Sequence, residues 1–153
     1  IRQKKIKLTI AGKPMINLKR YIEIINRYNI GDKINWDLGY KSDYEISKLF
    51  NSTKLVVLPY RDIDASGIVN LCFTSQTPVI LSDLESFQDD YKKTSGVVFA
   101  KKNDHRDFSK KILYLFNSTQ VYRNMHNKIK IKSRSINTWQ EVGSKIRYFL
   151  ELE

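Results

Sequence analysis

The chain has little of what would indicate a disulfide-bonded or membrane-spanning protein. Only one of its 153 residues is a cysteine, Cys72, so no disulfide can form within the chain. Cys72 lies in an apolar stretch, where we expect a small buried hydrophobic residue. No apolar run reaches the roughly 18 residues that a membrane span requires. The chain begins at Ile1 with no methionine and no signal-peptide pattern, so we expect a domain excised from a longer protein.

Signatures of metal and P-loop sites are also missing. The two histidines, His105 and His126, are far apart, and neither has a cysteine or acidic partner at ligand spacing. We therefore expect both at the surface and predict no metal site. The chain has no Gly-x4-Gly-Lys motif, which argues against a P-loop nucleotide hydrolase.

What the chain does contain is a globular composition with a large positive charge. Hydrophobic residues make up 41%, including nine tyrosines and seven phenylalanines, enough for a core. The net charge of +11 suits nucleic acid, an anionic membrane surface or phosphate-bearing ligands, although coding bias is an alternative origin. Basic residues are spread along the chain, with local density at 2–7 and 128–134. No nucleic-acid-binding motif accompanies them, so we predict no nucleic-acid partner.

The hydrophobic pattern alternates between strands and helices. We expect strands at 7–12, 33–40, 55–58, 79–81 and 97–100, in the order β-α-β-α-β-α-β-β-α-α-α. Residues 117–119 split the helical pattern that begins at His105, and Thr138 starts a last helix. This alternation predicts an α/β fold, a Rossmann-like three-layer α/β/α domain with a mostly parallel sheet, in one domain over 1–153.

Helix boundaries carry local signals. Ser42 and Glu45 have the spacing of a capping box, which predicts a helix beginning after Ser42. Gly31 is expected near the end of the preceding helix, over 15–28.

The most informative segment is 55–82, an apolar strand, a short polar turn, a helix and a second apolar strand. In a parallel sheet this order brings Ser66 and Gly67 to the carboxyl end of a strand and the start of a helix. Such positions bind anionic ligands. The alternative interpretation is that Ser66 is only a helix cap and Gly67 only part of a tight turn.

Several motifs in order along the chain carry a family resemblance. They are Leu8–Gly12, Leu38–Tyr40, Ser42–Glu45, Val56–Arg61, Ser66–Ile68, Pro78–Ile80, Val98–Phe99 and Thr138–Trp139. In order and spacing they resemble the C-terminal, donor-nucleotide-binding domain of GT-B fold glycosyltransferases of family 4, also called group 1. The resemblance covers nearly the whole chain.

The resemblance implies a retaining glycosyltransferase that moves a sugar from a nucleotide-sugar to a glycan or lipid-linked acceptor in bacterial surface polysaccharide biosynthesis. The nucleotide-sugar is a substrate, and no cofactor is implied. The N-terminal acceptor domain and the first strand and helix of this domain are missing, so the chain alone should be almost inactive. The expected location is cytoplasmic, peripheral at the inner face of the cell membrane, whose anionic lipids attract basic residues.

The resemblance also implies which residues bind the donor. Arg61 would bind the diphosphate, since its guanidinium group can donate two parallel hydrogen bonds. The helix start at Ser66, Gly67, Ile68 and Val69 would bind it as well. The nucleoside would meet Gly39, Tyr40 and Tyr60, and the donor sugar or ribose would meet Asp64 and Glu85. Each also has an ordinary alternative role: Arg61 as a solvated side chain, Tyr60 as a core residue and Asp64 as a turn residue.

The chain departs from the family pattern where many members carry a second glutamate for the ribose hydroxyls. Leu71 or Cys72 stands there, and neither is acidic. No residue is an obvious nucleophile, so the catalytic residues are unknown. The alternative function is a non-catalytic basic α/β module that binds a protein partner or an anionic polymer.

Overall fold

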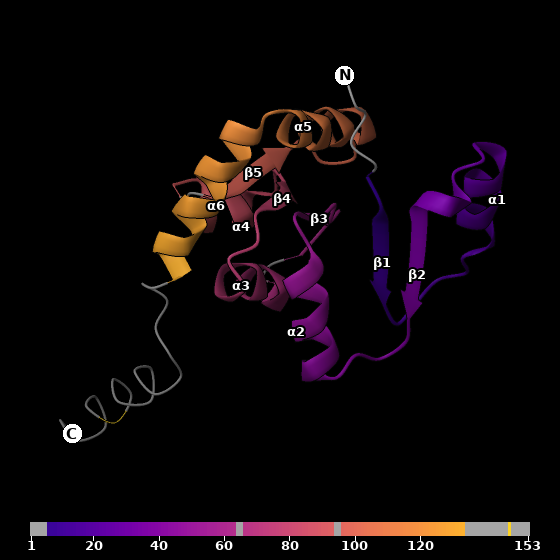
Figure 1. Ribbon diagram of the computed structural model, residues 1–153, viewed down its shortest axis with the longest axis horizontal. Helices are drawn as coiled ribbons and strands as arrows, with labels where there is room; N and C mark the ends of the chain where they lie inside the picture. The colour runs from indigo at the N-terminus through magenta and orange to yellow at the C-terminus, as the bar shows by residue number, and fades with distance from the viewer. Residues whose placement is uncertain (1–5, 64–65, 94–95, 134–146, 148–153) are drawn as a thin grey trace. The chain divides into compact units, whose positions relative to one another are not determined.

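The computed structural model describes residues 6–63, 66–93, 96–133 and 147 (Figure 1). Strands and helices alternate, and the strands pair in parallel, which confirms the predicted α/β class. The elements are β1 (Leu8–Gly12), α1 (Lys19–Arg27), the 3-10 turn η1 (Gly31–Lys33), β2 (Ile34–Leu38), α2 (Asp43–Ser52), β3 (Val56–Leu58), α3 (Gly67–Thr74), β4 (Val79–Ser82), α4 (Glu85–Tyr91), β5 (Val97–Ala100), α5 (His105–Asn117) and α6 (Thr119–Ser133).

Contacts within the chain group into two compact units, Ile1–Leu49 and Phe50–Glu153. The assignment of 1–153 to a single domain stays a prediction.

The first unit is built on the parallel pair β1 and β2, joined through α1. Both strands end at a glycine with positive φ, +124° at Gly12 and +113° at Gly39. The Gly39 N–H donates to the Gly12 carbonyl over 3.1 Å, so the two turns are linked. Because residues with a Cβ rarely adopt these angles, glycine is needed at both strand ends.

The helix of the first unit is shorter than the sequence predicts. It begins at Lys19, whose N–H donates to Asn17 Oδ1 over 2.8 Å, rather than at residue 15. It ends at Arg27 with Tyr28 as its C-cap, and Asn29 takes the left-handed position with φ +49°. The expectation that Gly31 lies near the end of this helix is therefore wrong, since Gly31 opens η1. Asparagine is one of the few residues besides glycine that tolerate this conformation.

The second unit contains a parallel sheet in the order β3-β4-β5. Leu58 lies opposite Leu81, and Leu81 lies opposite Phe99, so the three strands end at the same edge. The central strand β4 is buried at every position, whereas β3 is only half-buried. The apolar runs at 55–58 and 79–81 both predict strands buried on both faces. This is confirmed for β4, which has a partner on each side, and is wrong for β3, which among the described strands has a partner on one side only.

Two hydrophobic clusters cover the two faces of this sheet. Val79 and Leu81 of β4 belong to one cluster, and Ile80 belongs to the other, as expected from side chains that alternate along a strand. Cys72 lies fully buried in the first cluster, and this burial raises the pKa of its thiol to about 12. The cysteine is thus a small core residue, as predicted.

The later helices give one confirmation and one correction. The predicted break at 117–119 is confirmed, since α5 ends at Asn117 and α6 begins at Thr119. The direct strand-to-strand connection predicted after 79–81 is wrong, because α4 lies between β4 and β5. Parallel neighbours require a crossover connection, and here the crossover holds a short helix. Its two apolar residues, Phe87 and Tyr91, were too few to reveal a helical period.

Two predicted features of the C-terminal region have different outcomes. The last helix, predicted from Thr138, lies outside the described residues. Within 6–133, apart from its short gaps, no helix is both long enough and apolar enough to cross a membrane.

Candidate functional site

The predicted phosphate-binding residues lie at the carboxyl edge of the β3-β4-β5 sheet. Arg61 follows β3 and is exposed. Ser66 holds the cap position of α3, so Gly67, Ile68 and Val69 form the first turn of that helix. Ser66 and Val69 are buried, whereas Gly67 and Ile68 are exposed. The structure therefore brings this group to one sheet edge, as the segment order predicts.

The N-cap residue of α3, Ser66, does not cap the helix with its side chain. Ser66 is extended, and its side chain accepts no hydrogen bond from the backbone of α3. Its Oγ instead lies 3.3 Å from the hydroxyl oxygen of Tyr60. Among the described residues no acceptor is recorded for the N–H groups of Gly67 and Ile68. Such N–H groups and the helix dipole together favour an anion.

Space is available at this helix start. A Cβ added at Gly67 would meet no atom of the described residues within 4 Å, and the backbone there does not have the positive φ that requires glycine. Neither packing nor backbone geometry therefore accounts for this glycine. Close approach of a ligand to the backbone would account for it.

Two serines that sequence reasoning missed contact the loop before α3. Ser82 Oγ, at the end of β4, donates to the Tyr60 carbonyl over 2.6 Å. Ser86 Oγ, in α4, donates to the Ile63 carbonyl over 3.0 Å. A polar residue ending a buried strand is a signal that could have revealed Ser82, since buried hydroxyls are hydrogen-bonded. Ser86 gave no such signal, because its helix was not predicted.

Tyr60 belongs partly to the core. Its ring packs against the buried ring of Phe87, with centroids 6.0 Å apart, and it is half-buried. Its hydroxyl meets Ser66, so the same side chain joins the core to the helix start. The interpretation of Tyr60 as a core residue is thus supported by its ring, and its nucleoside role stays a prediction.

Of the two residues predicted to contact the donor sugar or ribose, the structure describes one, Glu85. Glu85 is the exposed first residue of α4 in the second unit. Asp64 lies outside the described residues. The neighbouring Asp83 accepts the Lys102 N–H over 2.6 Å and so holds the loop after β5.

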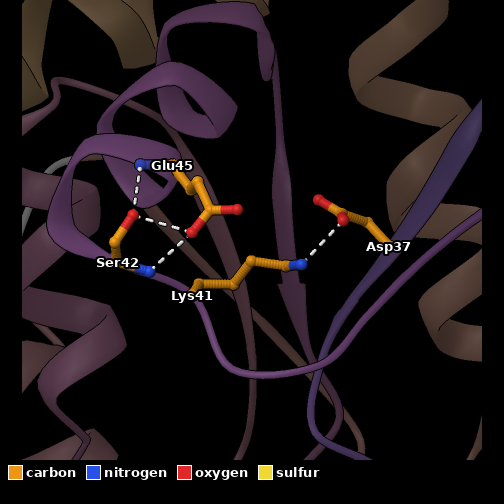
Figure 2. Close-up of polar contacts among 4 residues, drawn as sticks. All are labelled: Asp37, Lys41, Ser42 and Glu45. Carbon is orange, nitrogen blue, oxygen red and sulfur yellow. Dashed lines mark hydrogen bonds and ion pairs between the residues drawn. The ribbon is translucent and has the colours of Figure 1, made fainter.

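The predicted nucleoside residues Gly39 and Tyr40 lie in the first unit, directly after β2. Tyr40 is 89% exposed. Beside it, Lys41 makes an ion pair of 2.7 Å with Asp37 (Figure 2). Lys41 is only 13% exposed, so the chain leaving β2 is held close to the strand end.

The capping box predicted from the sequence is confirmed. Figure 2 shows the Ser42 N–H and Oγ both donating to Glu45 Oε2, over 2.8 and 2.7 Å. The Glu45 N–H donates back to Ser42 Oγ over 3.4 Å. These reciprocal bonds satisfy donors at the start of α2 and fix the turn that follows Tyr40.

The capping box should make the first unit sensitive to acid. Hydrogen bonds from the Ser42 hydroxyl and, second, from the Ser42 N–H lower the pKa of Glu45 below its ordinary value. A carboxyl group with a lowered folded pKa stabilises the fold above its unfolded pKa, and this stabilisation is lost as pH falls through the folded pKa. We expect Glu45→Gln to weaken the pH dependence of unfolding between about pH 5 and pH 3, measured by urea denaturation at each pH.

Glutamine keeps the capping-box geometry, so the substitution removes the titration and leaves the helix start in place. Asp104, which caps α5 and also has a lowered pKa, provides the comparison. Asp104→Asn should remove a separate part of the same pH dependence. An unchanged pH profile in Glu45→Gln would contradict the role of the capping box.

In the described part of the chain, no group of three or more histidine, cysteine or acidic residues could hold a metal ion. The expectation that the chain requires neither metal nor cofactor stays a prediction.

Comparison with known proteins points to one family. The family model described as "Glycosyl transferases group 1" matches residues 1–132. A search of curated proteins found no significant match.

Solved structures share the fold. The sucrose-phosphate synthase of Thermosynechococcus elongatus superimposes with a TM-score of 0.76 at 15% identity, over 100% of this chain and 40% of that protein. Anabaena Alr3699/HepE in complex with UDP gives 0.80 at 11% identity, over 97% and 41%. TarM gives 0.70 at 21% identity, over 95% and 28%. The chain therefore spans about two-fifths or less of these proteins.

Proposed function

Because the chain belongs to the group 1 glycosyl transferases, whose model matches residues 1–132, we propose that it forms the donor-binding part of a retaining glycosyltransferase. The enzyme transfers a sugar from a nucleotide-sugar to a glycan or lipid-linked acceptor in bacterial surface polysaccharide biosynthesis. The acceptor is bound by another part of the enzyme. The enzyme acts in the cytoplasm at the inner face of the membrane.

The observation that carries this proposal is the open start of α3, which lies at the same sheet edge as Arg61. A departing nucleoside diphosphate gains negative charge, which must be stabilised where the bond breaks. The N–H groups of Gly67 and Ile68 and the dipole of α3 provide donors at fixed positions. Arg61, exposed after β3, adds a cation able to bind two phosphate oxygens at once. This combination supports diphosphate binding without a metal ion.

Uridine diphosphate is the first nucleotide to test. One of the superimposed structures is Anabaena HepE with UDP, and another is the same protein with UDP-glucose. At 11% identity these superpositions support a shared fold, so the base of the donor for this chain is part of the proposal.

Binding of nucleotides to the chain tests the proposal directly. We expect isothermal titration calorimetry to give a UDP dissociation constant below about 1 mM, and the same value after addition of EDTA. The physical reason is that backbone donors and Arg61, rather than a metal, neutralise the diphosphate. Titrations with ADP and GDP provide the comparison for base selectivity.

No binding of any of the three nucleotides at millimolar concentration would overturn the proposal. Loss of binding in EDTA would overturn its metal-free part. Salt-sensitive binding of an anionic polymer that survives Arg61→Ala, with no nucleotide binding, would favour the basic-module alternative.

A further inference from the structure

Serines from two other elements donate hydrogen bonds to the loop backbone on both sides of Arg61. Ser82 binds the carbonyl of Tyr60, the residue before Arg61, over 2.6 Å. Ser86 binds the carbonyl of Ile63, two residues after Arg61, over 3.0 Å. The two serines come from β4 and α4, 22 and 23 residues further along the chain.

The bond from Ser82 is fixed by the sheet. Ser82 is fully buried, at the end of the central strand, and Leu81 before it lies opposite the last residue of β3. The serine therefore stands next to the point where the chain leaves β3. Because the Ser82 hydroxyl is fully buried, it must be satisfied within the protein, and the Tyr60 carbonyl is its acceptor.

Peptide geometry links this bond to the predicted phosphate site. In a planar trans peptide the carbonyl and the following N–H point in opposite directions. With the Tyr60 carbonyl held toward Ser82, the Arg61 N–H points away from Ser82. The Tyr60 hydroxyl also lies 3.3 Å from Ser66 Oγ, which joins this loop to the start of α3.

We propose that Ser82 and Ser86 are positioning residues for the diphosphate site. They hold the backbone on either side of Arg61 and so set Arg61 relative to the first turn of α3. Neither serine needs to touch the nucleotide. A loop that is already ordered loses less conformational freedom when the ligand binds, which raises affinity. This inference rests on the proposed function, because it assigns the serines to the same site.

The test compares three serine-to-alanine variants in the 153-residue chain. Ser86→Ala and Ser82→Ala each remove one of the two hydrogen bonds to the loop. Ser75→Ala is the matched control, because Ser75 Oγ also donates to a backbone carbonyl, that of Leu71 over 2.6 Å, but at the far end of α3. We expect about five-fold weaker UDP binding by calorimetry in Ser86→Ala and Ser82→Ala, and an unchanged value in Ser75→Ala.

Two further measurements distinguish positioning from general destabilisation. Trypsin cleavage after Arg61, with no ligand present, should be faster in Ser86→Ala than in the parent chain and unchanged in Ser75→Ala. Ser86→Thr keeps the hydroxyl and should restore both UDP affinity and resistance to cleavage. If Ser82→Ala does not fold, Ser86→Ala and Ser86→Thr decide the question.

The outcomes separate this inference from the proposed function. UDP binding that is equal in the parent chain and in Ser86→Ala overturns the inference alone. Equal weakening in Ser86→Ala and Ser75→Ala also overturns it, since stability would then be the cause. Absence of UDP, ADP and GDP binding in the parent chain overturns the proposed function and the inference together.

Discussion

Replacing Gly96 with alanine is expected to lower the free energy of unfolding by about 3 kcal/mol. Gly96 has φ +99°, a conformation that strains any residue with a side chain. An added Cβ would also lie 2.6 Å from the Cβ of Ile129, a fully buried residue of α6. Since the Cβ of Ile129 is fixed to its helix backbone, the helix or the strand start must shift. Urea denaturation of the chain measures the effect.

Two companion variants identify the cause of this loss. Gly67→Ala should leave stability nearly unchanged, because its Cβ would meet none of the described atoms within 4 Å and its φ is not positive. In a chain that already carries Ile129→Gly, which removes the Cβ at 2.6 Å, the Gly96→Ala substitution should cost at least 1 kcal/mol less than in the parent chain, by about the overpacking contribution. A Gly96→Ala variant as stable as the parent would contradict the close contact between α6 and the start of β5.

Arg61→Ala should weaken UDP binding by about ten-fold to a hundred-fold, the usual loss when a hydrogen bond to a charged group is removed. The side chain is exposed, so stability should change little. Arg61→Lys should recover only part of the affinity, since an ammonium group cannot make the forked contact of a guanidinium. Calorimetry with UDP measures the affinity, and urea denaturation measures the stability.

Controls for this prediction separate local contact from overall charge. Arg123→Ala removes the same charge from an exposed position on α6 and should leave UDP affinity within about two-fold. Gly67→Ala should lower UDP affinity without lowering stability, because the new methyl group would occupy open space at the helix start. Equal effects of Arg61→Ala and Arg123→Ala would indicate that net charge, rather than this site, attracts the nucleotide.

Local signals in the sequence were sufficient for much of the fold. The α/β alternation, the capping box of Ser42 and Glu45 and the break at 117–119 were all predicted and are all present. Each of these depends on residues within a few positions of one another, where propensity and hydrogen bonding act directly. The order of the motifs also led to the family whose model matches residues 1–132.

Local reasoning was wrong where two neighbouring signals compete or where the signal is short. Asn29, rather than Gly31, takes the left-handed position after α1, although both residues allow it. The helix α4 was missed because seven residues with two apolar positions do not establish a period. Packing of Phe87 into the core stabilises this helix, and that packing depends on the rest of the second unit.

Patterns along the chain are enough to predict the class of fold, the family and the segment in which a diphosphate site is expected. The surroundings of that segment follow from tertiary packing. The bonds from Ser82 and Ser86 to the loop of Arg61, and the contact of Gly96 with Ile129, join residues more than 20 positions apart. The bond from Ser82 follows from the parallel register, which aligns the ends of β3 and β4, and the contact of Gly96 follows from the packing of α6 against the start of β5. No local pattern in a single chain encodes that alignment.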